Sequence, residues 1–234
     1  MNCNPTIETT MSIPKSANQR ISTDMAEYYA KRADQHDNVY AKPERQADLP
    51  IVREWLRNAV TGHRVLEIAC GTGYWTAEAV RTAEHVLATD INAEVIALAQ
   101  ARNLPADKVE FALADAFAIE TSQPFTACLA SFWWSHVLRE QQDSFMERLR
   151  EQLGKDTLVV MMDNVYVEGI STSIARTDLQ GNTFQIRRLG SGERYEVVKN
   201  FPSDSGLRKR LSPHLKDIRI QRIEHYWMLT GRLK

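Results

Sequence analysis

The sequence predicts an α/β protein built on a doubly wound, mainly parallel β-sheet. Two observations carry this prediction. Between residues 64 and 163, short apolar runs alternate with segments that repeat their apolar residues at helical spacing. A glycine-containing loop follows the first of these runs, which is typical of the strand–loop–helix unit at the ligand crevice of such a sheet.

The first part of the chain precedes the sheet. Residues 1–22 are rich in Asn, Thr, Ser and Pro and lack the apolar centre of a signal peptide, so we expect a disordered N-terminal tail. Asp24 can cap a first helix, and a second helix begins near Asp48 with Pro50 in its first turn. These two helices occupy about residues 23–60.

The alternating region supplies the strands and helices of the sheet. Parallel strands are expected at 64–69, 86–89, 109–113, 125–131 and 157–163, and antiparallel edge strands at 218–223 and 226–233. Helices are expected over about 74–82, from Asn92 onward, and over 140–153, where Gly154 ends the last one. We expect all of these elements to form one domain at 23–234.

An insertion at about 164–200 interrupts this pattern. Residues 183–189 and 193–199 flank Gly190-Ser191-Gly192, which predicts a β-hairpin. Alternation along the two strands leaves the hairpin with one apolar face. Such a face needs cover, either from its own domain or from a second subunit in a homodimer.

Bulk composition excludes several kinds of partner. The formal net charge of -1 gives no overall basic field toward nucleic acid or an anionic membrane, and no apolar run is long enough to span a bilayer. The three cysteines include no CxxC pair, and their odd number does not fit a disulfide framework. We therefore expect a reduced, cytoplasmic protein without a nucleic-acid or membrane partner.

The segment Val65–Thr76 reads VLEIACGTGYWT and predicts a nucleoside-binding loop. Gly71 and Gly73 have no side chains, so a cofactor can approach their backbone closely. Asp90 ends the second strand, where a carboxylate can accept hydrogen bonds from ribose hydroxyls. This pairing of glycines with an acid places a nucleoside-bearing cofactor across the ends of the first two strands.

Two side chains indicate which kind of cofactor the loop binds. Thr76 stands where a dinucleotide fingerprint has Gly or Ala for close helix packing, which weakens a pyrophosphate-binding interpretation. Glu67 precedes the loop, and its carboxylate would repel a diphosphate but attract a ligand with an ammonium and a sulfonium.

The segment Val65–Gly73 resembles motif I of the class I S-adenosylmethionine-dependent methyltransferases. Asp90 matches the ribose-binding acid of that family, and Ala114-Asp115-Ala116 matches the segment that faces the adenine. Phe125–Phe132 is similar to the fourth strand, and the resemblance covers about residues 60–165 and resumes near Pro202. One departure is Ala69, where the family often has glycine.

The resemblance implies a seven-stranded, Rossmann-like fold that binds S-adenosylmethionine and transfers its methyl group by SN2 displacement. The cofactor residues it implies are Tyr28, Glu67, Ala69, Gly71, Gly73, Asp90, Ile91, Asp115, Ala116, Ser131 and Phe132. In similar small-molecule enzymes the N-terminal segment folds over the cofactor as a lid. Tyr28 and Tyr29 lie about 100° apart on a helix, so only one of them is expected to face the pocket.

The acceptor is expected beside the aromatic residues that follow the fourth strand. Candidate substrate-binding residues are Tyr29, Tyr40, Trp133, Trp134, Asn164 and Tyr166. His136 is the candidate general base, and the alternative is a histidine that only hydrogen-bonds the backbone. Burial of one tryptophan in the core is an equally open alternative to substrate contact.

The residues after the fourth strand also indicate which classes of acceptor are excluded. Ser131-Phe132-Trp133-Trp134 replaces the Asp/Asn-Pro-Pro-Tyr/Phe run of enzymes that methylate adenine in nucleic acid. No carboxylate group is evident at the end of the fourth strand, so we expect no metal. The resulting hypothesis is methyl transfer to an oxygen, nitrogen or sulfur atom of a small molecule. The alternatives are a protein methyltransferase, a non-catalytic cofactor-binding module and an aminopropyl transferase.

Overall fold

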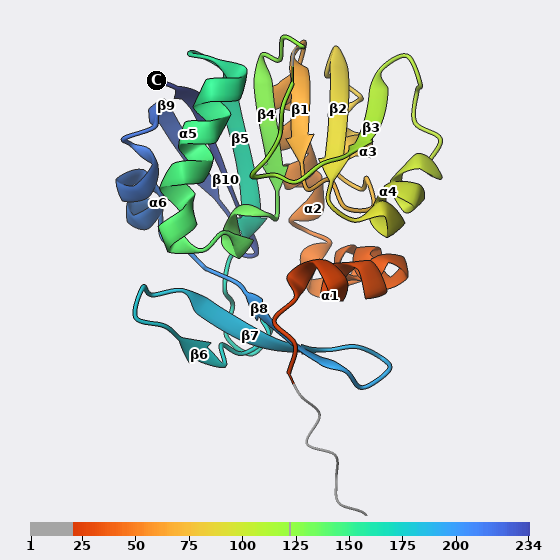
Figure 1. Cartoon of the computed structure of the whole chain (residues 1–234), viewed down its shortest axis with the longest axis vertical. Helices are drawn as coiled ribbons and strands as arrows, with labels where there is room; N and C mark the ends of the chain where they lie inside the picture. Colours follow the sequence, from red (N-terminus) through yellow and green to blue (C-terminus); the bar gives the residue numbers. More distant parts are fainter. Residues whose placement is uncertain (1–20, 122) are drawn as a thin grey trace, which may run out of the picture.

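The computed structural model describes residues 21–121 and 123–234. Its main body is a seven-stranded sheet with the order β3-β2-β1-β4-β5-β10-β9 (Figure 1). The first five strands in this order run parallel, and β10 lies antiparallel between β5 and β9. The predicted doubly wound, mainly parallel, seven-stranded fold is therefore confirmed.

The elements of this body follow the predicted order. Its strands are β1 (Arg64–Ile68), β2 (His85–Asp90), β3 (Val109–Leu113), β4 (Ala127–Ser131), β5 (Leu158–Asn164), β9 (Leu215–Arg222) and β10 (Tyr226–Leu233). Its helices are α2 (Leu49–Val60), α3 (Thr76–Ala79), α4 (Ala93–Gln100), α5 (Gln142–Leu153) and α6 (Asp204–Leu211), with short 3-10 turns η3 (Trp134–His136) and η4 (Arg139–Gln141). Helix α3 is shorter than predicted because the turns of the glycine loop extend to Trp75.

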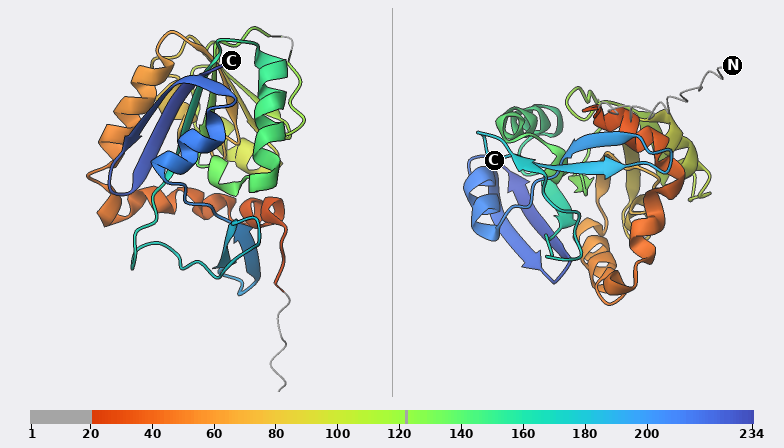
Figure 2. Two further views of the ribbon diagram at one scale, coloured as in Figure 1. Left: turned by 90° about the vertical axis from the view of Figure 1, so that its left-hand side faces the viewer. Right: turned by 90° about the horizontal axis from the view of Figure 1, so that it is seen from below.

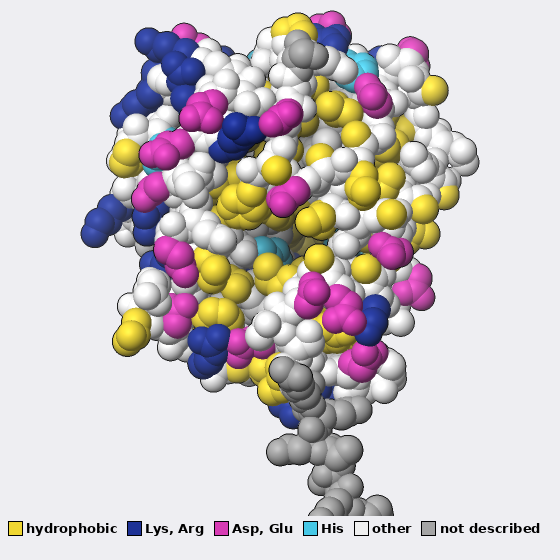
Figure 3. All heavy atoms as spheres, in the orientation of Figure 1, with side chains coloured by type: hydrophobic (Ala, Val, Ile, Leu, Met, Phe, Trp, Pro, Cys, Tyr) yellow, Lys and Arg dark blue, Asp and Glu magenta, His cyan; other side chains and the backbone are white. Residues whose placement is uncertain are grey.

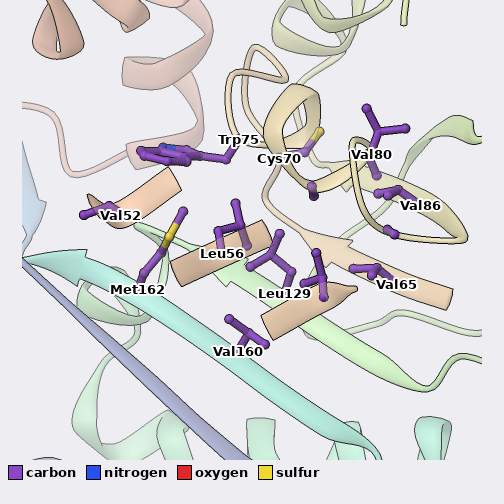
Figure 4. Packing of buried hydrophobic residues seen from close by; sticks show 14 of the residues in the cluster. Val52, Leu56, Val65, Cys70, Trp75, Val80, Val86, Leu129, Val160 and Met162 are labelled. Carbon is purple, nitrogen blue, oxygen red and sulfur yellow. The ribbon is translucent and has the colours of Figure 1, made fainter. Parts of the chain in front are cut away.

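Helices cover both faces of the sheet, as the side view in Figure 2 shows. On one face, α2, α3 and α4 pack their apolar residues against alternate strand residues, and Figure 4 shows this cluster around Leu56, Leu129 and Met162. On the other face, α5 and α6 pack against the intervening residues of β1, β4, β5 and β10. This alternation buries the central strands on both sides, which explains their nearly continuous apolar sequence.

The strand order reverses between β1 and β4, because the chain goes outward to β3 before it returns to the centre. In open α/β sheets this switch point leaves a crevice at the carboxyl ends of the strands, where ligands bind. The glycine loop leaves β1 at this crevice, and the Phe132–His136 segment leaves β4 beside it.

A second, three-stranded sheet faces this crevice (Figure 1). It contains β6 (Arg176–Thr177), β7 (Thr183–Arg188) and β8 (Arg194–Val198), so the predicted hairpin gains one short strand. Helix α1 (Met25–Lys31) packs on it and buries Tyr28 against Tyr195 and Val197. The face that carries Tyr195 and Val197 is thus covered within the chain. The prediction of one apolar face is wrong, because the strand register places Gln185 and Arg187 beside these residues and turns Phe184 and Ile186 to the opposite face.

The N-terminal segment continues from α1 through the 3-10 helices η1 (Ala33–Ala41) and η2 (Pro43–Arg45) across the carboxyl ends of the strands. Of the tail predicted at 1–22, residues 1–20 lie outside the described residues. Ser22 belongs to the ordered structure, because its backbone hydrogen-bonds Arg194 and Glu196 of β8 at 3.0 and 2.8 Å. Within the described chain, no helix is both long and apolar enough to cross a membrane.

Candidate functional site

One large cavity of about 670 Å³ lies between the carboxyl ends of the strands and the second sheet. Three parts of the chain form its wall: the loops after β1 to β5, the N-terminal segment from Met25 to Arg45, and the β7–β8 sheet with the loop that precedes it. In the space-filling view the middle of this face is hollowed and surrounded mainly by hydrophobic side chains (Figure 3). A volume of this size is typical of small-molecule sites.

The glycine loop owes its shape to three residues with left-handed backbone. Ala69, Gly71 and Gly73 have φ of 52°, 56° and 74°. A Cβ on Gly73 would lie 2.9 Å from Cβ of Ala99, so this glycine is needed for packing on α4, and it does not line the cavity. Gly71 does line it, and a Cβ there would meet the His36 ring at 3.4 Å.

Asp90 lies beside this loop at the end of β2. Its two carboxylate oxygens accept hydrogen bonds from the backbone N–H groups of Gly71 and Asn92, each at 2.9 Å. Burial raises the pKa of Asp90 and these two bonds oppose the rise. Each oxygen keeps a lone pair for a further donor, and the carboxyl group reaches the cavity wall.

The wall beside Asp90 continues over the ends of β2 and β3. Ile91 is half exposed and lies in the cavity, as do Asp115 and Ala116. Asp115 accepts a hydrogen bond from the N–H of Phe117 at 2.8 Å, which fixes the loop after β3. An apolar surface flanked by two carboxylates is suited to a nucleoside, with its ring on the apolar part and its hydroxyls on Asp90.

Glu67 lies behind the loop and not in the cavity wall. Its side chain is fully buried, and neither carboxylate oxygen has a hydrogen-bond partner among the described residues. Burial raises the pKa of Glu67 to about 8, and the charge of Asp90 adds to the rise. At neutral pH this shift favours the protonated, uncharged form of Glu67.

The N-terminal segment is fastened to the glycine loop through Asp37. The Thr72 hydroxyl donates to Asp37 at 2.5 Å, and Arg102 pairs with the same carboxylate. Burial works to raise the pKa of Asp37, but the donors of His36, Thr72 and Arg102 outweigh it and lower the pKa to about 2. These contacts hold η1 over the cavity, in the position of the predicted lid.

An aromatic cluster forms the middle of the cavity wall. Phe132 adopts a φ of 60°, which is unusual for a bulky residue, and stacks on Trp75 with ring centres 5.6 Å apart. The indole N–H of Trp75 donates to the Tyr40 hydroxyl at 2.8 Å. Packing from several sides holds Phe132 in this conformation, as expected for strain at a ligand site.

At the β4 end, Tyr29 and His136 meet in the cavity wall. The Tyr29 hydroxyl lies 3.0 Å from Nε2 of His136, and Nδ1 of His136 lies 2.6 Å from the carbonyl oxygen of Val198. A buried ion pair lies next to them. Lys199 donates to Asp163 at 2.7 Å and to the Ser135 hydroxyl at 2.6 Å.

The structure brings most of the predicted site residues to the cavity. Those that line it are Tyr29, Tyr40, Ala69, Gly71, Asp90, Ile91, Asp115, Ala116, Ser131, Phe132, Trp133, His136 and Asn164. Five do not line it: Tyr28, Glu67, Gly73, Trp134 and Tyr166. Tyr28 packs on Tyr195 while Tyr29 faces the cavity, which answers the question that helical spacing left open.

The other two residues outside the cavity wall have different packing partners. Trp134 is buried in the core with Phe145, whereas Trp133 lies in the cavity wall. Tyr166 packs against Phe201 with ring centres 5.2 Å apart. Within the described residues, no group of three or more His, Cys, Asp or Glu side chains is arranged to hold a metal ion.

Sequence reasoning missed the basic residues of the wall. Arg32 and Lys42 flank η1, Arg45 lies on η2, Arg187 on β7 and Lys199 just after β8. Nothing in their local sequence marks them, because basic residues in such segments are usually exposed to solvent. They reach the site only through the way that the N-terminal segment and the second sheet fold over the crevice.

The chain is similar to known methyltransferases. A family model described as a methyltransferase domain matches residues 65–156. No curated protein matches the sequence. Two solved structures are similar over most of their length: a DhpI–SAH complex, 28% identical with a TM-score of 0.73 over 89% of this chain and 94% of that chain, and a DhpI–SAM–HEP complex, 27% identical with a TM-score of 0.73 over 88% and 94%.

A third similar structure is the 1,6-didemethyltoxoflavin-N1-methyltransferase of Burkholderia thailandensis, with bound 1,6-didemethyltoxoflavin and S-adenosylhomocysteine. It is 16% identical with a TM-score of 0.54 and covers 97% of this chain and 93% of that chain. At this identity the likeness concerns the fold.

Proposed function

Because this chain is a class I S-adenosylmethionine-dependent methyltransferase, we propose that it methylates an oxygen, nitrogen or sulfur atom of a small-molecule acceptor. The observation that carries the proposal is that two further parts of the chain cover the carboxyl ends of the strands. The N-terminal segment and the second sheet are these parts, and together with the strand ends they form the wall of a cavity of about 670 Å³. Such a volume accommodates a cofactor and a small acceptor side by side, whereas an extended polypeptide needs an open groove.

The residues present fit S-adenosylmethionine. Gly71 offers bare backbone to the cavity, and Asp90 keeps acceptor capacity for ribose hydroxyls. Ile91 and Ala116 supply apolar surface for an adenine ring, next to the Asp115 carboxylate. Glu67 does not reach the cavity wall, so its part in binding would be to support the loop from behind.

When bound, the cofactor supplies a methyl group on a sulfonium, which is a strong electrophile. The chain's own residues then have two tasks. The aromatic cluster around Phe132 and the lid held by Asp37 exclude water, and the wall residues Tyr29 and Trp133 orient the acceptor. A general base is needed only where the acceptor atom carries a proton at working pH.

A protein methyltransferase is the main alternative, and a non-catalytic cofactor-binding module is another. The N-terminal segment and the second sheet, which line the cavity opposite the strand ends, favour a small acceptor over a protein side chain presented on a folded surface. An aminopropyl transferase would need acidic residues around an amine, but the wall near β4 and β5 is aromatic and basic. The paired Lys199 and Asp163 leave no free carboxylate at this end among the described residues.

Calorimetry with S-adenosylmethionine and S-adenosylhomocysteine tests the cofactor part of the proposal. Binding should be lost or at least tenfold weaker in Asp90→Ala, while the exposed Glu94→Ala on the following helix should bind as the wild type does. Formation of S-adenosylhomocysteine with a panel of small acceptors, compared with peptide and protein acceptors, tests the rest. Turnover confined to protein acceptors would contradict the small-molecule proposal.

A further inference from the structure

Building on the proposed methyl transfer, we infer that the acceptor carries an oxyanion, a carboxylate or phosphoryl group, that binds to Arg45 and Arg187 at the β5 end of the cavity. Acidic and basic side chains lie at different places along the cavity wall, and these two guanidinium groups have no carboxylate partner among the described residues.

Charge is divided between the two ends of the cavity. Of its two wall carboxylates, Asp90 ends β2 and Asp115 lies just after β3. The basic end lies at β5, because Arg45 donates to Asn164, the last residue of β5, at 2.9 Å. Three strand spacings separate β2 from β5 in the sheet, which corresponds to about 14 Å. The basic end is therefore well separated from the ribose-binding acid.

Arg45 is nearly buried, with 7% of its surface exposed, and no carboxylate of the described chain pairs with it. Its guanidinium lies 5.1 Å from the centre of the Tyr226 ring, and its Nε has no hydrogen-bond partner within residues 21–121 and 123–234. A buried cation without a counter-charge is costly to the folded protein. A bound anion would offset that cost, and the planar fork of donors suits the two oxygens of an oxyanion.

Arg187 approaches the same end from the second sheet. The side-chain oxygen of buried Gln185 accepts hydrogen bonds from its Nε and Nη2 at 3.2 and 2.6 Å, and Gln185 in turn donates to the carbonyl of Thr172. A neutral amide thus positions the guanidinium without neutralising it. Arg187 and Arg45 both act on the same neighbour, since the charge of each lowers the pKa of Lys199 after the larger effect of its burial.

The third basic group at this end already has a partner. Lys199 pairs with buried Asp163, so its charge is balanced before any ligand binds. No carboxylate of the described chain pairs with Arg45 or Arg187, and Asp163, the buried acid at this end, is already paired with Lys199. A neutral or cationic acceptor would leave both unbalanced, whereas an acidic acceptor would pair with them.

Anion binding to the protein saturated with S-adenosylhomocysteine tests the inference, because the carboxylate of the cofactor is then already in place. Calorimetric titrations use acetate, inorganic phosphate and, as a neutral probe, acetamide. We expect acetate or phosphate to bind and acetamide not to bind, and the stronger of the two anions identifies the acid class. Arg187→Gln and Arg45→Gln should each lower the affinity for that anion at least tenfold.

The matched control is Arg188→Gln, which removes the same charge from the next residue of β7, where the side chain is exposed. It should change anion affinity by less than twofold. Failure of both acetate and phosphate to bind would overturn the inference. Loss of S-adenosylhomocysteine affinity in both pocket variants would also overturn it, since these arginines would then serve the cofactor.

A second arm separates this inference from the proposed function. Acceptor pairs that differ only in an acid group, such as ethanol and glycolate or phenol and 4-hydroxybenzoate, are compared by formation of S-adenosylhomocysteine. Faster turnover of the acidic members supports the inference, and preference for the neutral members overturns it while leaving small-molecule methylation intact. If protein acceptors alone are methylated, the proposed function fails, and the binding titrations still decide whether an anion site exists.

Discussion

The hydroxyl of Tyr29 lies 3.0 Å from Nε2 of His136, at the end of a short chain of hydrogen bonds. Nδ1 of His136 lies 2.6 Å from the carbonyl oxygen of Val198, which can only accept, so Nδ1 carries the proton. Nε2 is then an acceptor, and the Tyr29 hydroxyl donates to it. The tautomer of His136 is thus fixed by the backbone, and the oxygen of Tyr29 keeps lone pairs toward the cavity.

This arrangement predicts that His136 acts through Tyr29 and is not itself a strong base. Burial lowers the pKa of His136, and the charge of Lys199 lowers it further, so its imidazole takes up a proton poorly. We expect Tyr29→Phe and His136→Asn each to reduce kcat/KM about tenfold with an acceptor from the panel. The double variant should be little worse than either single one, because both changes break the same chain.

The control for this pair is Tyr28→Phe, because Tyr28 packs on Tyr195 and lies outside the cavity wall. The rate profile of the wild type should show no titration near pH 6.5, the ordinary value for histidine. A general base would give a different result: His136→Asn would lose a hundredfold or more while Tyr29→Phe stayed active, and the profile would fall at acidic pH.

Glu67 predicts a pH dependence of stability. Its pKa is raised from 4.5 to about 8 by burial, so the folded state holds the proton more tightly than the unfolded state. Its stabilising contribution is complete below pH 4.5 and is lost as the pH rises through about 8, with a slope of about 1.4 kcal/mol per pH unit. Glu67→Gln removes this titration, so the variant should become more stable relative to the wild type as the pH rises.

Urea unfolding of the cofactor-free protein between pH 5 and 8 measures this difference. Glu110→Gln on β3 is the matched control, since that side chain is exposed. A difference between wild type and Glu67→Gln that stays constant across this range would show that Glu67 is ionised in the folded state.

The two glycines of the loop should respond differently to alanine. A Cβ on Gly73 would lie 2.9 Å from Cβ of Ala99, and its φ of 74° disfavours any side chain. We expect Gly73→Ala to destabilise folding by about 2–5 kcal/mol in urea unfolding. A Cβ on Gly71 would meet only the His36 ring, at 3.4 Å, so Gly71→Ala should cost about 1–2 kcal/mol of stability but weaken cofactor binding. Equal losses of stability would contradict this division.

The sequence was sufficient for the sheet because its signals are local. The run at Val109–Leu113 and the helix that Gly154 ends carry their own periodicity and stop signals, and both lie where they are predicted. The cofactor end was predictable for the same reason, since Gly71 lies in the loop after β1 and Asp90 ends β2. Gly73 shows the limit of this reasoning, because only the fold reveals that its neighbour is Ala99 and not the cavity.

The acceptor end was not predictable from local signals. Lys199 resembles an exposed residue at the end of a hairpin, yet it is buried against Asp163, 36 residues earlier in the chain. Arg45 lies in a polar 3-10 turn that no hydrophobic pattern marks. Contacts between segments that are distant in sequence create this end of the site, so it depends on tertiary structure that periodicity does not encode.

Contacts between segments that are distant in sequence also hold Asp37, and they should keep the N-terminal segment closed over the cavity. Asp37 lies on η1 and is held by Thr72 of the glycine loop and by Arg102, just beyond α4. Its pKa of about 2 keeps the carboxylate charged throughout the neutral range. Asp37→Asn removes the charge and weakens both contacts, so the N-terminal segment should open more often.

We expect Asp37→Asn to raise the Kd for S-adenosylhomocysteine about tenfold. The effect should come mainly from faster dissociation, because the lost contacts stabilise the closed state of the N-terminal segment. Stopped-flow measurement of tryptophan fluorescence can follow dissociation, since Trp75 lies in the cavity wall. Asp34→Asn removes an exposed charge from the same 3-10 helix and should leave both rates unchanged. An unchanged dissociation rate in Asp37→Asn would mean that the lid is held by its apolar contacts alone, with the ion pair contributing little, as many partly exposed pairs do.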